Sequence, residues 1–493
     1  MPSSAPGILE SVDIASLRGE IELLEELGPR LTGTAAHERL ISHVADQLGA
    51  ARLEVREDVH SFTRWELARH PGSLELQVEG QLLEVSSAFP YSGTTGAAGV
   101  SGPLRLLHGP LPHWRAARGA IAVVAIRQRH LPVRGVINTW DESDAWGSLA
   151  NPLVPALLAG LGLQRARRAG VTAVVFVWQG MSADNARGQY LPFTLPYQNI
   201  PAVFVAGSAG QSVLRAAARR QQATLALDAR LVPDARTRTI WAVAPGTRRP
   251  DETLLVVSHS DGTNSVEENG HIALLALARD LQERPPERSI VFVLSTGHLR
   301  IPALTRQGQA MTRWLRDHPQ WWAGGARQKQ AVAALAIEHL GALEYRDDAT
   351  GSGSGPTGKL EPELLYATTR ELQQLVRSEW RGADPGRTRV SAPSALIHFG
   401  EGEPAYRQRI PGISLCTAPQ YLLAERQGNL VDIAALQRQV DSFRRLLRRL
   451  DVLPRRQLGT VASSGGIAQA RALGTVLRSF VGQALQTRPR AWG

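Results

Sequence analysis

The sequence of 493 residues contains one cysteine, Cys416, so an intrachain disulfide is excluded. So little cysteine fits a reducing compartment. Long apolar runs are also missing: none approaches the roughly 20 residues that a helix needs to cross a bilayer. The segment from Met1 to Leu31 has no basic stretch followed by an apolar one, so no secretion signal is indicated. We therefore expect a soluble, cytoplasmic protein that is not attached to a membrane.

Lysine is nearly absent as well. Only Lys329 and Lys359 are lysines among the 55 basic residues, so the formal net charge of +10 comes from arginine. The arginines are scattered, and no basic motif is interleaved with aromatic residues, so we expect no nucleic-acid partner. The densest run lies on a predicted helix and is either a solvated face or a contact surface for an anionic partner. It consists of Arg444, Arg445, Arg448 and Arg449.

Apolar strands alternate with amphipathic helices over much of the chain. The length predicts two or three domains, and the 43% hydrophobic content is typical of a globular protein. Continuous apolar runs separated by helices are typical of buried parallel strands. We therefore expect an α/β fold in which a mostly parallel or mixed sheet is sandwiched by helices. The expected strands are 253–258, 289–295, 331–337 and 412–415, and the expected helices are 271–281, 302–316 and 431–450.

The amino-acid composition changes from about residue 88, where glycine, proline and serine cluster. Short apolar runs then predict a separate β-rich unit with about two helices. We expect a discontinuous α/β domain at 1–88 and 240–455, an inserted domain at 89–239, and a C-terminal appendage at 456–493. The segment 349–358 is rich in glycine and serine and predicts a loop.

Histidines and carboxylates follow the predicted strands of the α/β domain, at the point where each strand ends. In open α/β sheets, ligands bind outside these carboxyl ends. Carboxylates that converge on one spot repel each other unless a cation joins them, and histidine with carboxylate is a normal shell for zinc and transition metals. Each residue alone could be an ordinary loop residue, or an acid at a helix start, but their recurrence favours a metal site. The residues are His259, Asp261, Glu267, Glu268, His298, Glu338, His339, His398, Glu401 and Glu403.

Several phrases in the sequence resemble the zinc aminopeptidase family that includes aminopeptidases S and Y, glutamate carboxypeptidase II and the glutaminyl cyclases. The matching phrases are Gly28-Pro-Arg-Leu-Thr-Gly33, Leu254-Leu-Val-Val-Ser-His259-Ser-Asp261-Gly, Val266-Glu-Glu268-Asn269-Gly270 and Ala334-Leu-Ala-Ile-Glu338. The inserted segment resembles a protease-associated domain through Ala169-Gly-Val-Thr-Ala-Val-Val-Phe and Asn199-Ile-Pro-Ala-Val-Phe-Val. The resemblance extends to about Leu453, and the order and spacing of the phrases carry it.

The resemblance implies a metal-binding role for particular residues. His259 would bind the metal and Asp261 would support its imidazole. Glu268 takes the place of an aspartate that bridges two zinc ions, and Glu338 takes the place of a second metal-binding aspartate.

Two departures from the family pattern affect the remaining positions. The family's paired glutamates, a general base and a zinc ligand, correspond to His298 and Leu299. The last family ligand, a histidine, falls near Gly402, so Glu401 or Glu403 would have to substitute, and we expect Glu403 to be the metal ligand.

These residues predict a metal-dependent hydrolase of the aminopeptidase type, acting on an amide bond of a small peptide or N-acyl amino acid. His298 would be the general base with Glu267 in reserve, and Arg407 would hold a substrate carboxylate. One or two divalent ions are expected, zinc first and manganese as an alternative because carboxylates prefer harder ions. The alternatives are an inactive binding or scaffold protein and a single-metal acyl-transfer or cyclase variant. The sequence leaves open whether the protein forms a homo-oligomer.

Overall fold

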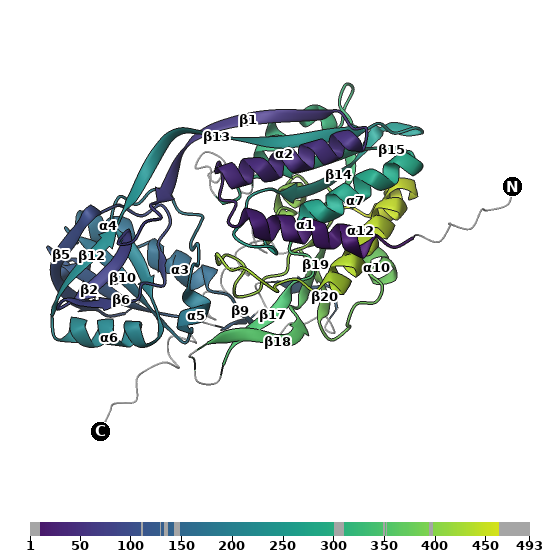
Figure 1. Cartoon of the computed structure of the whole chain (residues 1–493). Coiled ribbons are helices and arrows are strands. Elements are labelled where there is room, and N and C mark those ends of the chain that lie inside the picture. The colour runs from purple at the N-terminus through teal and green to yellow at the C-terminus, as the bar shows by residue number, and fades with distance from the viewer. Residues whose placement is uncertain are drawn as a thin grey trace.

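The protein, described by a computed structural model, is built around two large sheets, each with its own helices (Figure 1). Among the residues that the structure describes, no helix is both long and apolar enough to cross a membrane. The structure describes residues 10–109, 112–128, 130–132, 137–141, 148–299, 310–348, 351, 353–393 and 398–462.

Among these residues, the larger sheet has nine strands in the order β1-β13-β15-β14-β16-β21-β19-β20-β8. Its centre, from β15 to β21, is parallel, whereas β13 and β19 run antiparallel to their central neighbours, so the sheet is mixed. The predicted continuous apolar runs form this parallel centre. The strands are β1 (Val55–Leu67), β8 (Asn138–Thr139), β13 (Ala229–Ala244), β14 (Arg249–His259), β15 (Arg288–Ser295), β16 (Gln330–Ile337), β19 (Glu363–Ala367), β20 (Thr388–Ala392) and β21 (Gly412–Leu415).

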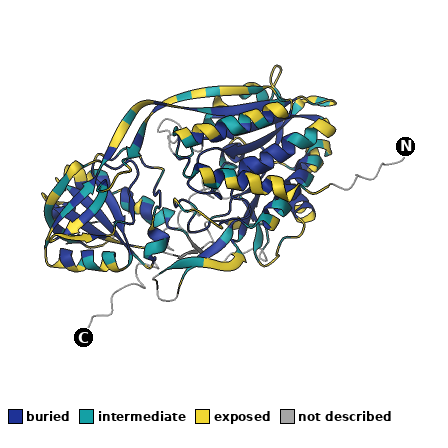
Figure 2. Cartoon of the chain, in the orientation of Figure 1, coloured by how far each residue is buried: buried dark blue, intermediate teal, exposed yellow. Residues whose placement is uncertain are grey.

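Two apolar layers cover this sheet, because successive residues of a strand point to opposite faces. Leu254 and Val256 of β14 pack against one helical layer, and Leu255 and Val257 pack against the other. Figure 2 shows the central strands as buried and the outer helix faces as exposed. The first layer contains α1 (Ile14–Leu27), α2 (Ala35–Ala50), α7 (Gly270–Glu283), α10 (Arg370–Glu379) and α12 (Ile433–Val452), and the second contains α9 (Met311–Asp317) and α11 (Glu403–Arg407).

The smaller sheet has the order β3-β2-β12-β5-β6-β10-β11-β4 and is packed by α3 (Leu153–Gly160), α4 (Leu163–Arg168) and α6 (Gly207–Ala218). The strands β1 and β13 form a long antiparallel ribbon that runs from one sheet to the other (Figure 1). The strands are β2 (Leu74–Val78), β3 (Gln81–Leu83), β4 (Ser87–Ala88), β5 (Gly96–Leu107), β6 (Ile121–Arg127), β10 (Ala173–Gln179), β11 (Ala202–Val205) and β12 (Gln222–Leu227).

The observed strand pairing corrects several expectations. β2, β3 and β4 belong to the smaller sheet, so that unit begins before the expected boundary at residue 89. β8, within the segment expected to be inserted, instead joins the edge of the larger sheet. The expected loop at 349–358 contains most of β18 (Ser354–Leu360), which pairs with β17 (Leu343–Asp347). The residues of the expected helix before 310, and of the C-terminal appendage after 462, lie outside the described residues.

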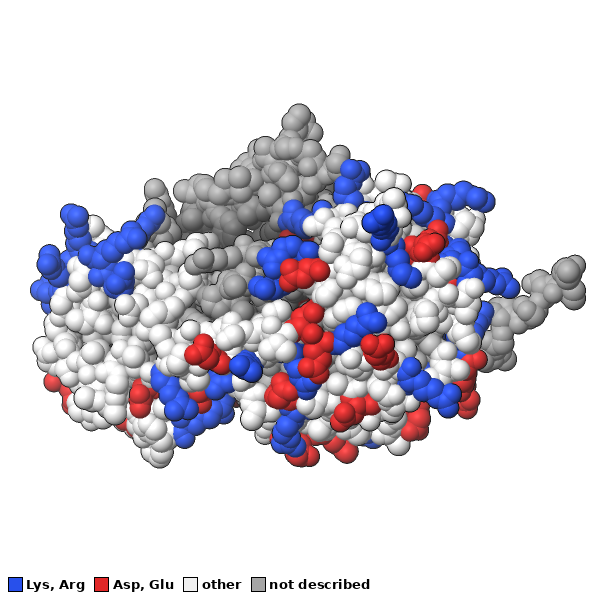
Figure 3. All heavy atoms as spheres, turned by 90° about the horizontal axis from the view of Figure 1, so that it is seen from above, with Lys and Arg blue, Asp and Glu red and all other residues white. Residues whose placement is uncertain are grey.

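The arginine run at 444–449 serves the fold itself. Arg444 is buried in α12 and pairs with Asp280 of α7 at 2.6 Å and with Asp441 at 2.9 Å. Arg448 contacts Asp280 at 3.3 Å. On the face seen in Figure 3, basic side chains mix with acidic ones over the larger sheet, whereas at the left end, over the smaller sheet, they stand mostly alone. The run therefore joins two helices and is not a free anion-binding surface.

The start of α7 contacts the sheet so closely that only glycine fits. A Cβ atom at Gly270 would overlap the carbonyl oxygen of Ile337 and the hydroxyl of Ser258. We expect Gly270→Ala to lower the free energy of unfolding by about 1–3 kcal/mol or more, because the helix must shift. The control, Gly19→Ala, has open space around it in α1 and should raise stability by about 0.5–1 kcal/mol. Urea denaturation that gives equal stabilities for both variants would contradict this account.

A carboxylate on α1 contacts a histidine on α2. His43 Nε2 lies 3.0 Å from Glu20 Oε2, and this hydrogen bond raises the pKa of His43. Because the pKa of His43 is higher in the folded chain than its unfolded value of about 6.5, the pair stabilises the fold fully at pH values below about 6.5. This stabilisation is lost as the pH rises through the folded-state pKa. Between about pH 6 and 8 we expect a loss of about 0.5–1 kcal/mol from this partly exposed pair. Thermal unfolding at several pH values checks this, and His43→Gln should remove that part of the slope.

Candidate functional site

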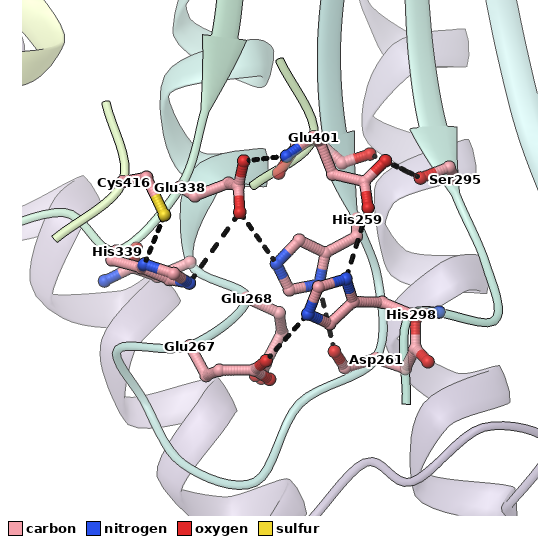
Figure 4. A network of polar contacts seen from close by, with 12 residues as sticks. His259, Asp261, Glu267, Glu268, Ser295, His298, Glu338, His339, Glu401 and Cys416 are labelled. Atoms are coloured by element: carbon pink, nitrogen blue, oxygen red, sulfur yellow. Dashed lines mark hydrogen bonds and ion pairs between the residues drawn. The ribbon is translucent and has the colours of Figure 1, made fainter. Parts of the chain in front are cut away.

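The carboxyl ends of the parallel strands bring a cluster of buried polar side chains together (Figure 4). His259 ends β14, His298 follows β15, and Glu338 with His339 follows β16. Glu267 comes from the turn before α7. These strands are neighbours in the sheet, so residues far apart in the sequence meet at one edge.

Four of these side chains form the centre of the cluster. Glu338 Oε2 lies 3.7 Å from His259 Nε2 and 3.8 Å from His339 Nε2. Ligand atoms of His259, Glu267 and His339 lie within 4.8 Å of one another. Both histidine Nε2 atoms, both Glu267 oxygens and Glu338 Oε2 are buried without a hydrogen-bond partner. Buried polar atoms without partners are rare in proteins, so five of them at one spot point to a water or an ion among them.

The two imidazoles are held in the tautomer that a metal requires. His259 Nδ1 donates to the carbonyl oxygen of Asp261 at 3.0 Å, and His339 Nδ1 donates to that of Thr417 at 2.5 Å. A carbonyl can only accept, so each Nε2 keeps its lone pair for the cluster. Burial lowers the pKa of His259 well below its usual value and that of His339 to about 3, so both rings are neutral. His339 also holds a left-handed backbone conformation, with φ of 57°.

The pKa values of the carboxylates are shifted in the opposite direction. Burial raises the pKa of Glu267 well above its usual range, and the negative charge of Glu268 adds to this rise. Burial also raises the pKa of Glu338, with a further contribution from Glu401. A divalent cation among these oxygens would relieve the repulsion, and two imidazoles with two carboxylates suit such an ion.

Glu268 is not part of this cluster. Its carboxylate forms a fully buried ion pair with Arg30, from the phrase Gly28-Pro-Arg-Leu-Thr-Gly33. Arg30 also donates to the carbonyl oxygens of Leu24, Gly28 and Asn264. The pairing with Arg30 uses one oxygen of Glu268, and it is the neighbouring Glu267 that lies with His259 and His339, so this geometry gives the predicted metal-ligand role of Glu268 no support.

Asp261 supports the site differently from the expectation. Its backbone carbonyl, not its carboxylate, accepts from His259. The carboxylate accepts from Thr32 Oγ1 at 2.5 Å and from the backbone N–H groups of Leu299 at 2.6 Å and His298 at 3.2 Å. Asp261 therefore anchors the loop that carries His298.

His298 lies between two carboxylates. Its Nδ1 is 3.2 Å from Glu401 Oε1, and its Nε2 is 3.4 Å from Glu267 Oε1. The ring stacks on His259 at 4.2 Å and contacts Phe193 at 5.1 Å. Burial alone would lower the pKa of His298, but the hydrogen bond to Glu401 and the charges of Glu267 and Glu401 raise it to about 10.

Two other predicted residues lie outside the cluster. Glu403 pairs with Arg407 at 2.8 Å on the same short helix, and Arg407 is exposed. Arg407 does not line the cavity described below, so its predicted role with a substrate carboxylate has no support. Glu401, two residues earlier, points inward and accepts from the Met311 N–H at 3.1 Å and Ser295 Oγ at 3.4 Å.

The sequence analysis listed His339 among the strand-end residues without a ligand role, and it missed Cys416. His339 comes two residues after β16 and Cys416 directly after β21, and this position is the signal that could have identified them. His398, which follows β20, lies elsewhere and packs between Tyr366 and Tyr406.

A cavity of about 330 Å³ opens above the cluster. The cluster side of its wall includes Glu267, His298, Glu338 and His339. Phe193 and Leu153, from the segment with the smaller sheet, also line the cavity. Leu299, at the position where the resemblance expects a glutamate ligand, is buried in the apolar cluster of that segment. The smaller unit thus helps to enclose the site.

Comparison with known proteins identifies the fold. No family model matches the chain, and no curated protein matches it by sequence. A zinc aminopeptidase from Bacillus subtilis superposes with a TM-score of 0.61 at 15% identity, over 89% of this chain and 95% of its own. A peptidase precursor from Shewanella amazonensis gives 0.64 at 14% identity, over 89% and 93%. An aminopeptidase from an Aneurinibacillus strain gives 0.58 at 13% identity, over 89% and 94%. The chain therefore has the zinc-aminopeptidase fold that its sequence resemblance predicted.

Proposed function

We propose that this chain is a metal-dependent hydrolase that cleaves an amide bond of a small peptide with a free amino end. The observation that carries the proposal is the set of buried, unpartnered ligand atoms at the strand ends, beneath a cavity large enough for a small substrate. A structural core has no use for such atoms, because each costs about 1–3 kcal/mol when it is left without a partner.

His259, Glu267, Glu338 and His339 would hold the ion. Two imidazole nitrogens and two carboxylates suit zinc, with manganese as the harder alternative. A bound ion of this kind polarises a carbonyl group and lowers the pKa of its bound water. Leu299 and Gly402 stand where the resemblance expects two further metal ligands. The residues therefore support a site for one metal ion and not for the two ions that the family binds.

His298 would accept the proton of an attacking water once ion binding lowers its pKa from the value of about 10 that Glu401 and Glu267 give it. Glu401 faces Nδ1 and fixes the ring, so that Nε2 faces Glu267 and the cavity. An imidazole oriented by a carboxylate on its far nitrogen is a common arrangement for a general base. Part of the raised pKa of His298 comes from the charge of Glu267, which ion binding would neutralise.

The charge of the cavity favours a peptide with a free amino group over an N-acyl amino acid. The described residues that line it include four carboxylates and neither lysine nor arginine. A substrate carboxylate would face these acids with no arginine or lysine to hold it, whereas an ammonium group would be attracted. The carboxylates are Glu267, Glu338, Glu361 and Glu403.

Substitutions at two adjacent glutamates should affect ion binding and folding stability separately. After chelation, Glu267→Gln should bind zinc at least about tenfold more weakly than the unmodified chain. It should keep its stability, because neither oxygen of Glu267 accepts a hydrogen bond in the fold. Glu268→Gln should keep zinc binding and lose about 3–5 kcal/mol of stability, because Arg30 is left unpaired. Calorimetric titration and urea denaturation measure the two effects, and the reverse pattern would refute the proposed ligand set.

His298 should be essential for turnover but not for ion binding. With a dipeptide substrate, we expect His298→Gln to lower kcat by about 10²–10⁴-fold at unchanged zinc content. His70→Gln, an exposed histidine in the chain leading to β2, is the matched control and should leave kcat unchanged. The N-acetylated dipeptide should be a much poorer substrate.

Unchanged kcat in the His298 variant would remove this residue from the mechanism. If the unmodified chain neither binds a divalent ion nor cleaves any peptide, the enzymatic proposal fails and the alternative of a binding or scaffold protein stands.

A further inference from the structure

The only cysteine of the chain lies beside the cluster. Cys416 directly follows β21, is buried, and lines the cavity. Its Sγ lies 4.0 Å from His339 Nδ1. Ligand atoms of Glu338, His339 and Cys416 lie within 4.8 Å of one another, which makes them a second group beside that of His259, Glu267 and His339.

This second group has unpartnered atoms of its own. Glu338 Oε2 and His339 Nε2 accept no hydrogen bond, and the two residues are 1% and 3% exposed. Figure 4 shows Cys416 beside His339 and Glu338, at the end of the cluster away from His298. The thiol therefore extends the row of donors away from His298.

The spacing of these atoms is close to that of a coordination shell. Zinc–sulfur bonds are about 2.3 Å and zinc–nitrogen bonds about 2.0–2.1 Å, so two donors on one ion are separated by at most about 4.4 Å. Side-chain shifts of a few tenths of an ångström would bring the three atoms within this limit. A thiolate is a soft donor that zinc, cobalt and cadmium accept readily and manganese does not.

We propose that Glu338, His339 and Cys416 form a sulfur-containing position for a soft divalent ion, with Cys416 as a thiolate ligand. This inference rests on the ion site of the proposed function and adds a ligand that gives it metal selectivity. His339 belongs to both groups, so the two groups share one ion. A hard ion is held by the nitrogen and oxygen ligands alone, and a soft ion also takes the Cys416 thiolate. Coordination releases the thiol proton to solvent as the metal–sulfur bond forms.

Cobalt(II) absorption tests this ligand directly. A cobalt–thiolate bond gives an intense charge-transfer band in the near ultraviolet, and Cys416 is the only residue in the chain that can supply a thiolate. We expect the full chain, stripped of metal and titrated with cobalt(II), to develop this band up to about one equivalent. The unmodified protein is sufficient, so the result does not depend on the folding of a variant.

The variant Cys416→Ser supplies the selectivity test. It should lack the cobalt band and bind zinc at least about tenfold more weakly. Its manganese affinity should stay within about twofold, because a hard ion makes little use of sulfur. A circular dichroism spectrum like that of the unmodified chain checks that the variant is folded.

Two outcomes would overturn the inference. Cobalt that binds at about one equivalent without a charge-transfer band would show that Cys416 is only a buried apolar thiol. Equal losses of zinc and manganese affinity in Cys416→Ser would show a general disturbance of the site and not a sulfur ligand. In both cases peptide cleavage by the ion-loaded chain can still be present, so the proposed hydrolase is judged separately by its turnover.

Discussion

Mutual repulsion of buried carboxylates is the constraint on which the candidate site depends. Glu267, Glu338 and Glu401 share one edge of an apolar sheet, where water cannot screen them. The fold pairs Glu401 with His298 and one oxygen of Glu268 with Arg30, but leaves oxygens of Glu267, Glu268 and Glu338 without hydrogen-bond partners. These unpartnered carboxylate oxygens lie beside two neutral imidazoles. This selective neutralisation separates side chains that support the site from those free to bind an ion.

The architecture was largely predictable because the central strands are continuous apolar runs. The runs at 253–258 and 289–295 can only be satisfied inside a covered sheet, and the polar residues after them must then meet at one edge. Strands with polar surfaces were harder to assign: β13 has an exposed first half and a buried second half, because its first half belongs to the ribbon outside the sheet. The boundary of the smaller unit was misplaced because the residues of β2 alternate between buried and more exposed positions, and a half-buried strand of either sheet would show the same pattern.

The site was predictable at the level of strand ends but not at that of single residues. Glu267 and Glu268 are identical in type and adjacent, and only the angle at which the chain enters α7 decides which one faces the cluster. Glu401, just before α11, and Glu403, the first residue of α11, differ in the same way. Arg30 lies more than 200 residues from Glu268, and no local pattern predicts that pairing. His339 was named with Glu338 but overlooked as a ligand, because a residue after a strand usually points away from its neighbour.

The left-handed backbone of His339 has a thermodynamic consequence for the whole chain. This conformation disfavours a side chain that is not glycine by roughly 1–2 kcal/mol, and it adds to the cost of the unpartnered carboxylates nearby. An ion that binds only the folded chain offsets both, and adds stability that grows with the logarithm of its free concentration. The supply of metal in the surroundings would then determine how much of the protein survives proteolysis, in addition to how much of it is active.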